Sequence, residues 1–160
     1  MACITFEETL HCPVDAQRMF HAMFLDAHNL MPKIMPHAVK SVDFVSGDGG
    51  SGSIQQVNFC EGGPVKYVKN RLDSKDKAHF ECNYTVIESD AFGDTVDHIS
   101  NEIKFEVAPG GGCICKSKSS YYPKAGAILN EDELKVRRQR SKGLYKIVQD
   151  YLVENPDVYA

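Results

Sequence analysis

"HFECNYTVIESDAFGDTVDHISNEIKFEV", residues 79–107, decides the fold class, because it holds two successive segments in which apolar residues recur every second position. Side chains two positions apart lie on the same face of an extended strand. The apolar sets are Phe80, Cys82, Tyr84 and Val86, then Ile99, Ile103, Phe105 and Val107. The alternation predicts two neighbouring strands, each with one apolar face.

The strand pattern continues on both sides of this stretch. The further segments are "AVKSVDFV" (38–45), "SIQQVNF" (53–59), "KYVKNRL" (66–72) and "CICKSKSSYY" (113–122), and the first ten residues also alternate. Glycine-rich turns such as "EGGP" (61–64) and "APGGG" (108–112) separate them. Short turns between successive strands predict a meandering antiparallel sheet.

Helical spacing occurs only before and after this region. Pro13 and Asp15 open a short helix, with Asp15 as the expected N-cap, and a second short helix begins near Asp26. The stripe of the first helix is Met19, Phe20, Met23 and Phe24. A long helix is predicted for 130–154, closed by Pro156. The fold class is therefore α+β.

The long helix is apolar on one side in its second half only. The apolar stripe is Leu144, Ile147, Val148, Tyr151 and Leu152. Continued backward, the same face carries Ser141, Arg140 and Arg137. Because an unpaired buried charge is strongly unfavourable, this half is expected to cover water, a pocket mouth or a charged ligand. Hydroxyl groups among apolar strand residues agree, and the two patterns predict a hollow interior with a mixed lining.

The loop "SGDGGSGSIQQ", residues 46–56, resembles a phosphate-binding loop in its glycine content. Its glycines are Gly47, Gly49, Gly50 and Gly52. A nucleotide-triphosphate loop needs a lysine and a hydroxyl that open a helix, whereas here Ser53 and Ile54 open a strand. We interpret the loop as a strand connection that needs positive φ angles, with weak anion binding by its amides as the alternative.

Composition sets limits on location and partners. The 160 residues are expected to form one domain, 1–160, with a net charge of −4 that does not favour nucleic acid. The chain has no signal-like start and no run of membrane-spanning length, which predicts a cytoplasmic protein that does not enter membranes. The six cysteines are expected to be free thiols, and no metal or cofactor is predicted.

Several separated motifs together resemble the plant pathogenesis-related class-10 family, which includes the major birch-pollen allergen. They are "GDGGSGSI", "KYVKNRLDSKDKAHFECNYTVIE", "GDTVDHISNEIKFE", "SSYYPK" and "VQDYLVENPDVY", and the likeness covers essentially all 160 residues. The resemblance implies a helix-grip fold, in which a seven-stranded curved antiparallel sheet holds the long helix. Two short helices would close one end of a large internal cavity.

The resemblance also implies a function. Family members are intracellular, defence-related proteins that bind flavonoids, cytokinins, sterol-like hormones and fatty acids, so a mostly monomeric carrier or buffer is expected. The implied ligand-binding residues are Phe59, Tyr67, Phe80, Cys82, Tyr84, Val86, Ile103, Tyr121, Arg140 and Leu144. Arg137 or Arg140 would favour an anionic ligand, unless both send their charged ends to water. A defence or storage role that depends on abundance alone is a further alternative.

An enzyme is the remaining alternative. Ribonuclease activity has been proposed for the family, but its lysine position here is Gln55, and its glutamate positions are Asp97 and Gln149. Only Tyr151 matches. Glutamine neither titrates nor carries positive charge, which argues against RNA cleavage.

Other relatives catalyse condensations with a cavity lysine, an acid and a tyrosine. Lys116 and Lys118 lie near Tyr121 in the sequence, but the period of two places them on the opposite face. These lysines are therefore expected to face solvent.

Overall fold

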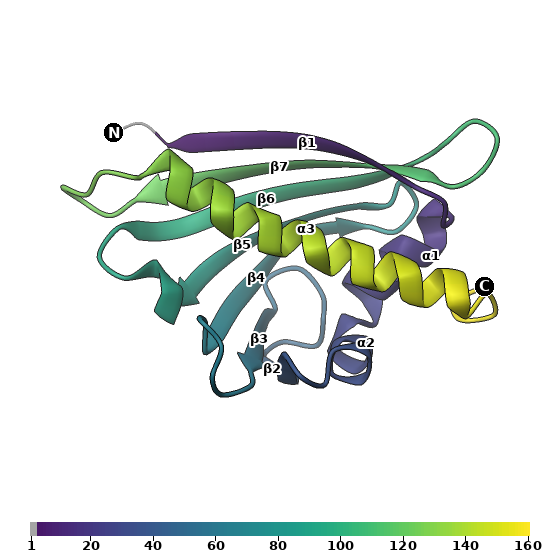
Figure 1. Cartoon of the computed structure of the whole chain (residues 1–160), viewed down its shortest axis with the longest axis horizontal. Helices are drawn as coiled ribbons and strands as arrows, with labels where there is room; N and C mark the ends of the chain where they lie inside the picture. The colour runs from purple at the N-terminus through teal and green to yellow at the C-terminus, as the bar shows by residue number, and fades with distance from the viewer. Residues whose placement is uncertain (1–2) are drawn as a thin grey trace.

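The computed structural model describes residues 3–160, apart from the side chain of Ser141, and these residues contain one seven-stranded antiparallel sheet (Figure 1). The strands are β1 (Ile4–Cys12), β2 (Val39–Ser46), β3 (Ile54–Phe59), β4 (Tyr67–Asp76), β5 (Glu81–Ser89), β6 (Val96–Val107) and β7 (Cys113–Pro123). Their order is β1-β7-β6-β5-β4-β3-β2, so every strand from β2 to β7 pairs with its neighbour in sequence. The predicted antiparallel meander is confirmed.

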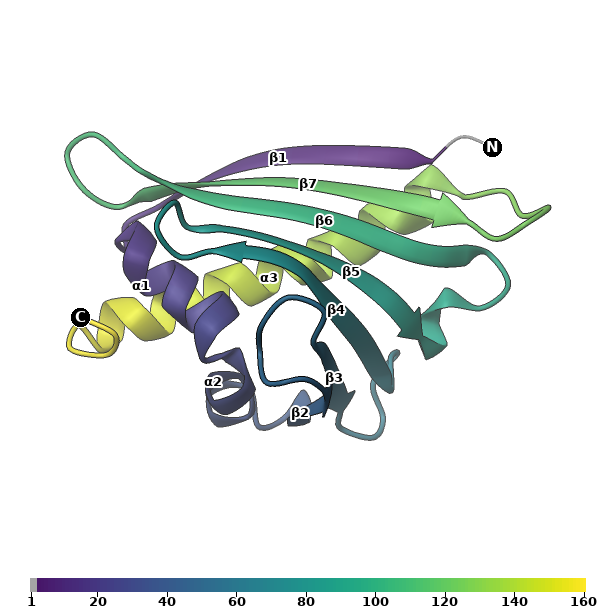
Figure 2. The same ribbon diagram turned by 180° about the vertical axis from the view of Figure 1, so that it is seen from behind.

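Helical segments lie at the two ends of the chain. They are α1 (Ala16–Phe20), the π-helical turn η1 (His21–Leu25), α2 (Ala27–Ile34), the 3₁₀ turn η2 (Asp90–Phe92) and α3 (Glu131–Glu154). Figures 1 and 2 show α3 crossing one face of the curved sheet, with α1 and α2 beside its C-terminal half. The predicted helix-grip architecture is confirmed.

The two predicted helix starts differ in their caps. Asp15 occupies the N-cap of α1, as predicted, although its side chain makes no capping hydrogen bond. Asn130 caps α3, because its side-chain oxygen accepts a hydrogen bond of 3.1 Å from the Glu133 amide. The long helix therefore has the defined start that α1 lacks.

The hydrophobic core divides into two clusters along α3. The larger one joins α1, η1 and α2 to the C-terminal half of α3, where Val148 and Leu152 are fully buried. The smaller one contains Phe92, Val96, Tyr121 and Leu134, near the start of α3. Between them, Leu144 and Tyr145 are only partly buried. Dense packing thus fixes the two ends of the helix more than its middle.

Arg18 on α1 fastens the chain where α3 ends. Its guanidinium group donates hydrogen bonds to the carbonyl oxygens of Leu152, Asn155 and Val158, at 3.0, 2.9 and 2.9 Å. The last carbonyl groups of a helix have no donor within the helix, so the Arg18 guanidinium group supplies the missing hydrogen bonds. Arg18 therefore positions the C-terminal half of α3 against α1.

Replacing Arg18→Met should lower the free energy of unfolding by about 2–3 kcal/mol, because partly buried carbonyl oxygens lose a charged donor. Urea unfolding followed by circular dichroism measures this change. Arg71→Met is the matched control, since Arg71 is exposed and its partner is Asp73 at 2.8 Å. The control should lose less than about 1 kcal/mol of stability. An equal loss in both variants would contradict the stabilising role of the Arg18 hydrogen bonds.

Candidate functional site

Two rows of side chains cross the concave face of the sheet from β1 to β4. One row is Phe6, Ser119, Asn101, Tyr84 and Leu72, and the other is Glu8, Ser117, Ile103, Cys82 and Lys75. Residues paired directly across antiparallel strands project to the same face. Each row mixes apolar and hydrogen-bonding groups, so the face beneath α3 is amphipathic.

Two tyrosines lie near each other between the sheet and the middle of α3. Burial raises the pKa of Tyr84 on β5 and of Tyr145 on α3, which keeps both phenols protonated. Both side chains nevertheless keep part of their solvent-accessible surface, unlike the fully buried Val148 one turn further along α3. The two phenol groups are therefore neutral hydrogen-bonding groups that remain accessible.

Most predicted lining residues lie on or beside this face. All of them except Tyr67 and Arg140 belong to the two core clusters or pack against them. Those that do are Phe59, Phe80, Cys82, Tyr84, Val86, Ile103, Tyr121 and Leu144. Cys82, Ile103 and Tyr121 are buried, and the others keep intermediate exposure. The structure thus brings these residues together around α3.

Tyr67 lies on the other face of the sheet, so its predicted place in the interior is wrong. It pairs with Asn58, and its hydroxyl donates a 2.9 Å hydrogen bond to Glu88. The apolar residues of β4 that face α3 are Val68 and Leu72, which pack toward Val57 and Tyr84. Because Tyr67 is an odd number of positions from both, it projects outward.

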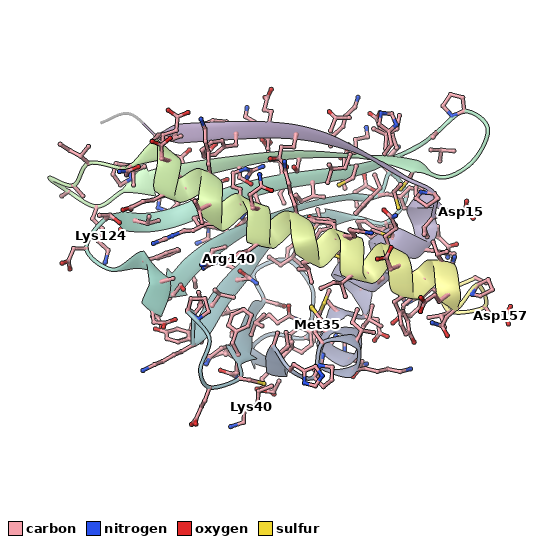
Figure 3. The ribbon with its side chains drawn as sticks, viewed as in Figure 1. Asp15, Met35, Lys40, Lys124, Arg140 and Asp157 are labelled. Atoms are coloured by element: carbon pink, nitrogen blue, oxygen red, sulfur yellow. The ribbon has the colours of Figure 1, made fainter. Side chains whose placement is uncertain are left out.

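The inner face of α3 is rotated relative to the predicted stripe. Val148 and Leu152 are fully buried as expected, but Ile147 is 43% exposed. Arg140 is exposed and lies on the edge of α3 away from β1 (Figure 3). Arg138 is the buried arginine, with 8% exposure. The predicted continuation through Ser141 involves a side chain outside the described residues.

Arg138 reaches β1 through a small charge cluster. Its Nη2 lies 3.2 Å from Oε1 of Glu8, and Nζ of Lys142 lies 3.2 Å from the same oxygen. The guanidinium group also lies 5.0 Å from the ring centroid of Phe6. Sequence reasoning missed this cluster, although Glu8 was a visible signal, since it shares the inner parity of Phe6 and Leu10.

The glycine loop connects β2 to β3, as predicted. Gly47, Gly49 and Gly52 have φ angles of +80°, +106° and +87°, whereas Gly50 has no positive φ. The loop is fixed from inside, because Nζ of Lys75 donates a 2.9 Å hydrogen bond to the Gly49 carbonyl oxygen. Burial lowers the pKa of Lys75. Sequence reasoning also missed this lysine, which a bulge in β4 turns inward.

The residues at the family's ribonuclease positions come from different elements. Gln55 lies on β3 and Asp97 on β6, while Gln149 and Tyr151 lie on α3. Asp97 is exposed, and its carboxylate is 2.6 Å from Nδ1 of His98. Within residues 3–160, no hydrogen bond or ion pair joins these positions to one another.

The two lysines on β7 lie on the convex face, as predicted from their parity. Lys116 forms an ion pair of 3.0 Å with Glu106, and Lys118 is exposed between Glu7 and Glu102 of the flanking strands. Neither belongs to the face that carries Tyr121.

Two hollows occur outside the concave face. One, of about 570 Å³, surrounds the β3–β4 connection and is lined by residues such as Lys40, Asn58 and Lys66. The other, of about 450 Å³, lies on the convex side between charged residues such as Glu102 and Lys118. Both are rimmed by polar groups and differ in chemistry from the face beneath α3.

Residues 3–160 contain no group of three or more His, Cys, Asp or Glu side chains placed to hold a metal ion. None of the helices described here combines the length and the apolar character needed to cross a membrane.

The fold and these motifs can be compared with known proteins. Residues 1–155 match the model of the pathogenesis-related protein Bet v 1 family. The chain belongs to this family. Its members bind small hydrophobic ligands, and membership supports a defence-related, ligand-binding protein.

Individual relatives agree over the full length. The chain is 43% identical to the major strawberry allergen Fra a 1.07 of Fragaria ananassa, over 99% of both chains. The crystal structure of Ara h 8.0201 matches with a TM-score of 0.86 and 29% identity, covering 96% of this chain and 99% of that one. Norcoclaurine synthase from Thalictrum flavum shares the fold, with a TM-score of 0.74 and 17% identity over 96% of this chain and 88% of that one.

Replacing Glu8→Gln should lower the free energy of unfolding by about 2–3 kcal/mol, because Arg138 would keep a buried charge without its carboxylate. Chemical denaturation of the variant measures the loss. Glu7→Gln, one position earlier on the exposed face of β1, is the control and should change stability by less than about 0.5 kcal/mol. Similar values for both variants would show that the Glu8 cluster does not hold α3.

Proposed function

We propose that the chain binds an amphiphilic small molecule between the concave face of the sheet and the middle of α3. The observation that supports this proposal is that Tyr84 and Tyr145 are surrounded by protein and yet partly accessible. Both are surrounded by enough protein to raise their pKa values, yet both keep accessible surface. Side chains that are surrounded by protein but keep accessible surface can line a pocket for a small molecule.

The surroundings of the two tyrosines support the same role. Partly buried apolar side chains extend from β2 to β5 and along α3. They include Val42, Val57, Phe59, Leu72 and Leu144. Removing apolar surface from water contributes about 25 cal/mol per Å², so a ligand that buries about 300 Å² gains roughly 7 kcal/mol before ordering costs. An affinity in the micromolar range or weaker, and tolerance of many ligand shapes, follow.

The proposed ligands are flavonoids, cytokinins, sterol-like hormones and fatty acids, held by apolar area and oriented by a few hydroxyl groups. In this proposal residues 1–160 act as one domain, and the protein is a cytoplasmic, mostly monomeric carrier or buffer in plant defence. The relatives among plant allergens support the family context of this role.

Filling the proposed space should abolish binding without unfolding the protein. Val57→Trp places an indole on the concave face of β3, and we expect at least a tenfold loss of affinity for the dye N-phenyl-1-naphthylamine, because the indole would occupy the volume that the dye needs. Fluorescence titration measures the affinity.

The matched control is Ile54→Trp, on the same strand and also half-buried, but paired with Arg71 on the other face. This variant should bind the dye as the natural chain does. Equal losses in two folded variants, or undiminished binding by Val57→Trp, would contradict the proposed location.

A further inference from the structure

The charge cluster between α3 and β1 contains more positive than negative charge. Arg138 and Lys142 both approach the single oxygen Oε1 of Glu8, at 3.2 Å each. The side chain of Glu8 is 20% exposed and that of Arg138 only 9%. One carboxylate therefore faces two cations, the nearly buried Arg138 and the 36% exposed Lys142, which leaves one unit of positive charge uncompensated within the cluster.

Arg138 also carries an unused donor. Its Nε is buried and has no hydrogen-bond partner among the described residues. Buried polar groups in proteins almost always have a partner, and leaving one without is costly. The guanidinium group stacks against Phe6 at 5.0 Å, and this contact with the ring face supplies no acceptor to Nε–H. The buried guanidinium group of Arg138 therefore keeps hydrogen-bonding capacity that the described residues do not use.

The sheet below adds further donors. Ser119 donates a 2.8 Å hydrogen bond to the side-chain oxygen of Asn101, so the only acceptor atom of that amide is already in use. The Nδ2 group of Asn101 makes one long bond of 3.4 Å to the Ile99 carbonyl oxygen. Both Asn101 and Ser119 lie in the row that begins at Phe6 and continues to Tyr84. Asn101 Nδ2 therefore keeps one N–H group that makes no hydrogen bond to another described residue.

We propose that Arg138, together with Lys142 and Asn101, anchors an anionic group of the ligand, such as a carboxylate, sulfonate or phenolate. This inference rests on the proposed function and specifies the ligand class. The anion would accept charge-assisted hydrogen bonds beside Glu8, and the apolar remainder would extend along the row toward Tyr84. Arg138 thereby takes the role that the sequence suggested for Arg137 or Arg140.

Two dyes with the same aromatic frame test this anchor. They are 8-anilinonaphthalene-1-sulfonate, which is anionic, and N-phenyl-1-naphthylamine, which lacks the sulfonate. Arg138→Met should weaken binding of the anionic dye at least tenfold and change that of the neutral dye less than twofold. Arg140→Met, an exposed arginine on the same helix, is the control and should alter neither affinity more than twofold.

A second variant separates an anchor from a purely structural arginine. Glu8→Gln removes the carboxylate that competes for Arg138 and Lys142, so the anionic dye should bind at least threefold more tightly. A structural role alone predicts weaker or unchanged binding. If Arg138→Met does not fold, the double variant Glu8→Gln with Arg138→Met removes both buried charges and should show the same selective loss of the anionic dye.

The outcomes distinguish the two proposals. Equal weakening of both dyes in a folded Arg138 variant, or an unchanged affinity for the sulfonate, would overturn the anchor while leaving the carrier role in place. Failure of either dye to bind the natural chain would overturn the carrier role, and the anchor with it.

Discussion

The attachment of α3 to the sheet differs between its two halves, and the proposed site beneath the middle of the helix depends on that difference. In the C-terminal half, Val148 and Leu152 are fully buried, and Arg18 binds the carbonyl oxygens where the helix ends. In the N-terminal half, Leu134 packs in a small cluster and Arg138 reaches Glu8. A helix held in this way can span a sheet without filling every position beneath its middle.

The sheet supplies the complementary curvature. Register shifts interrupt the pairing of β4 with β5 and of β2 with β3, and such bulges bend a strand and increase its twist. One of them also turns Lys75 toward the glycine loop, where it binds the Gly49 carbonyl oxygen. The strands far from β1 therefore curl around α3, as Figure 2 shows, and carry half-buried apolar side chains on their inner face.

Local periodicity was sufficient to predict the strands, the long helix and most of the concave face, because a period of two in β5 and β6 places Cys82, Tyr84 and Ile103 on one side. The family resemblance, in contrast, implied an interior place for Tyr67, although Val68 has the inner parity. The inner face of α3 was predicted from apolar residues such as Leu144 and Tyr151. That prediction placed Arg140, and not Arg138, on the side that faces the sheet. The inner parity of Glu8 was visible in the sequence, but the contacts of Glu8 and Arg18 join segments far apart in the chain, so no local pattern names their partners.

The two kinds of attachment also respond differently to dissolved salt. Ions screen charges over a Debye length of about 8 Å at physiological strength, and Lys142 is 36% exposed beside Glu8. Screening would weaken the attraction between Lys142 and Glu8, whereas it would leave the burial of Val148 and Leu152 unchanged. Backbone amides of the N-terminal half would then exchange with deuterium faster at high salt concentration. Ionic strength would therefore control how often this end of α3 separates from the sheet.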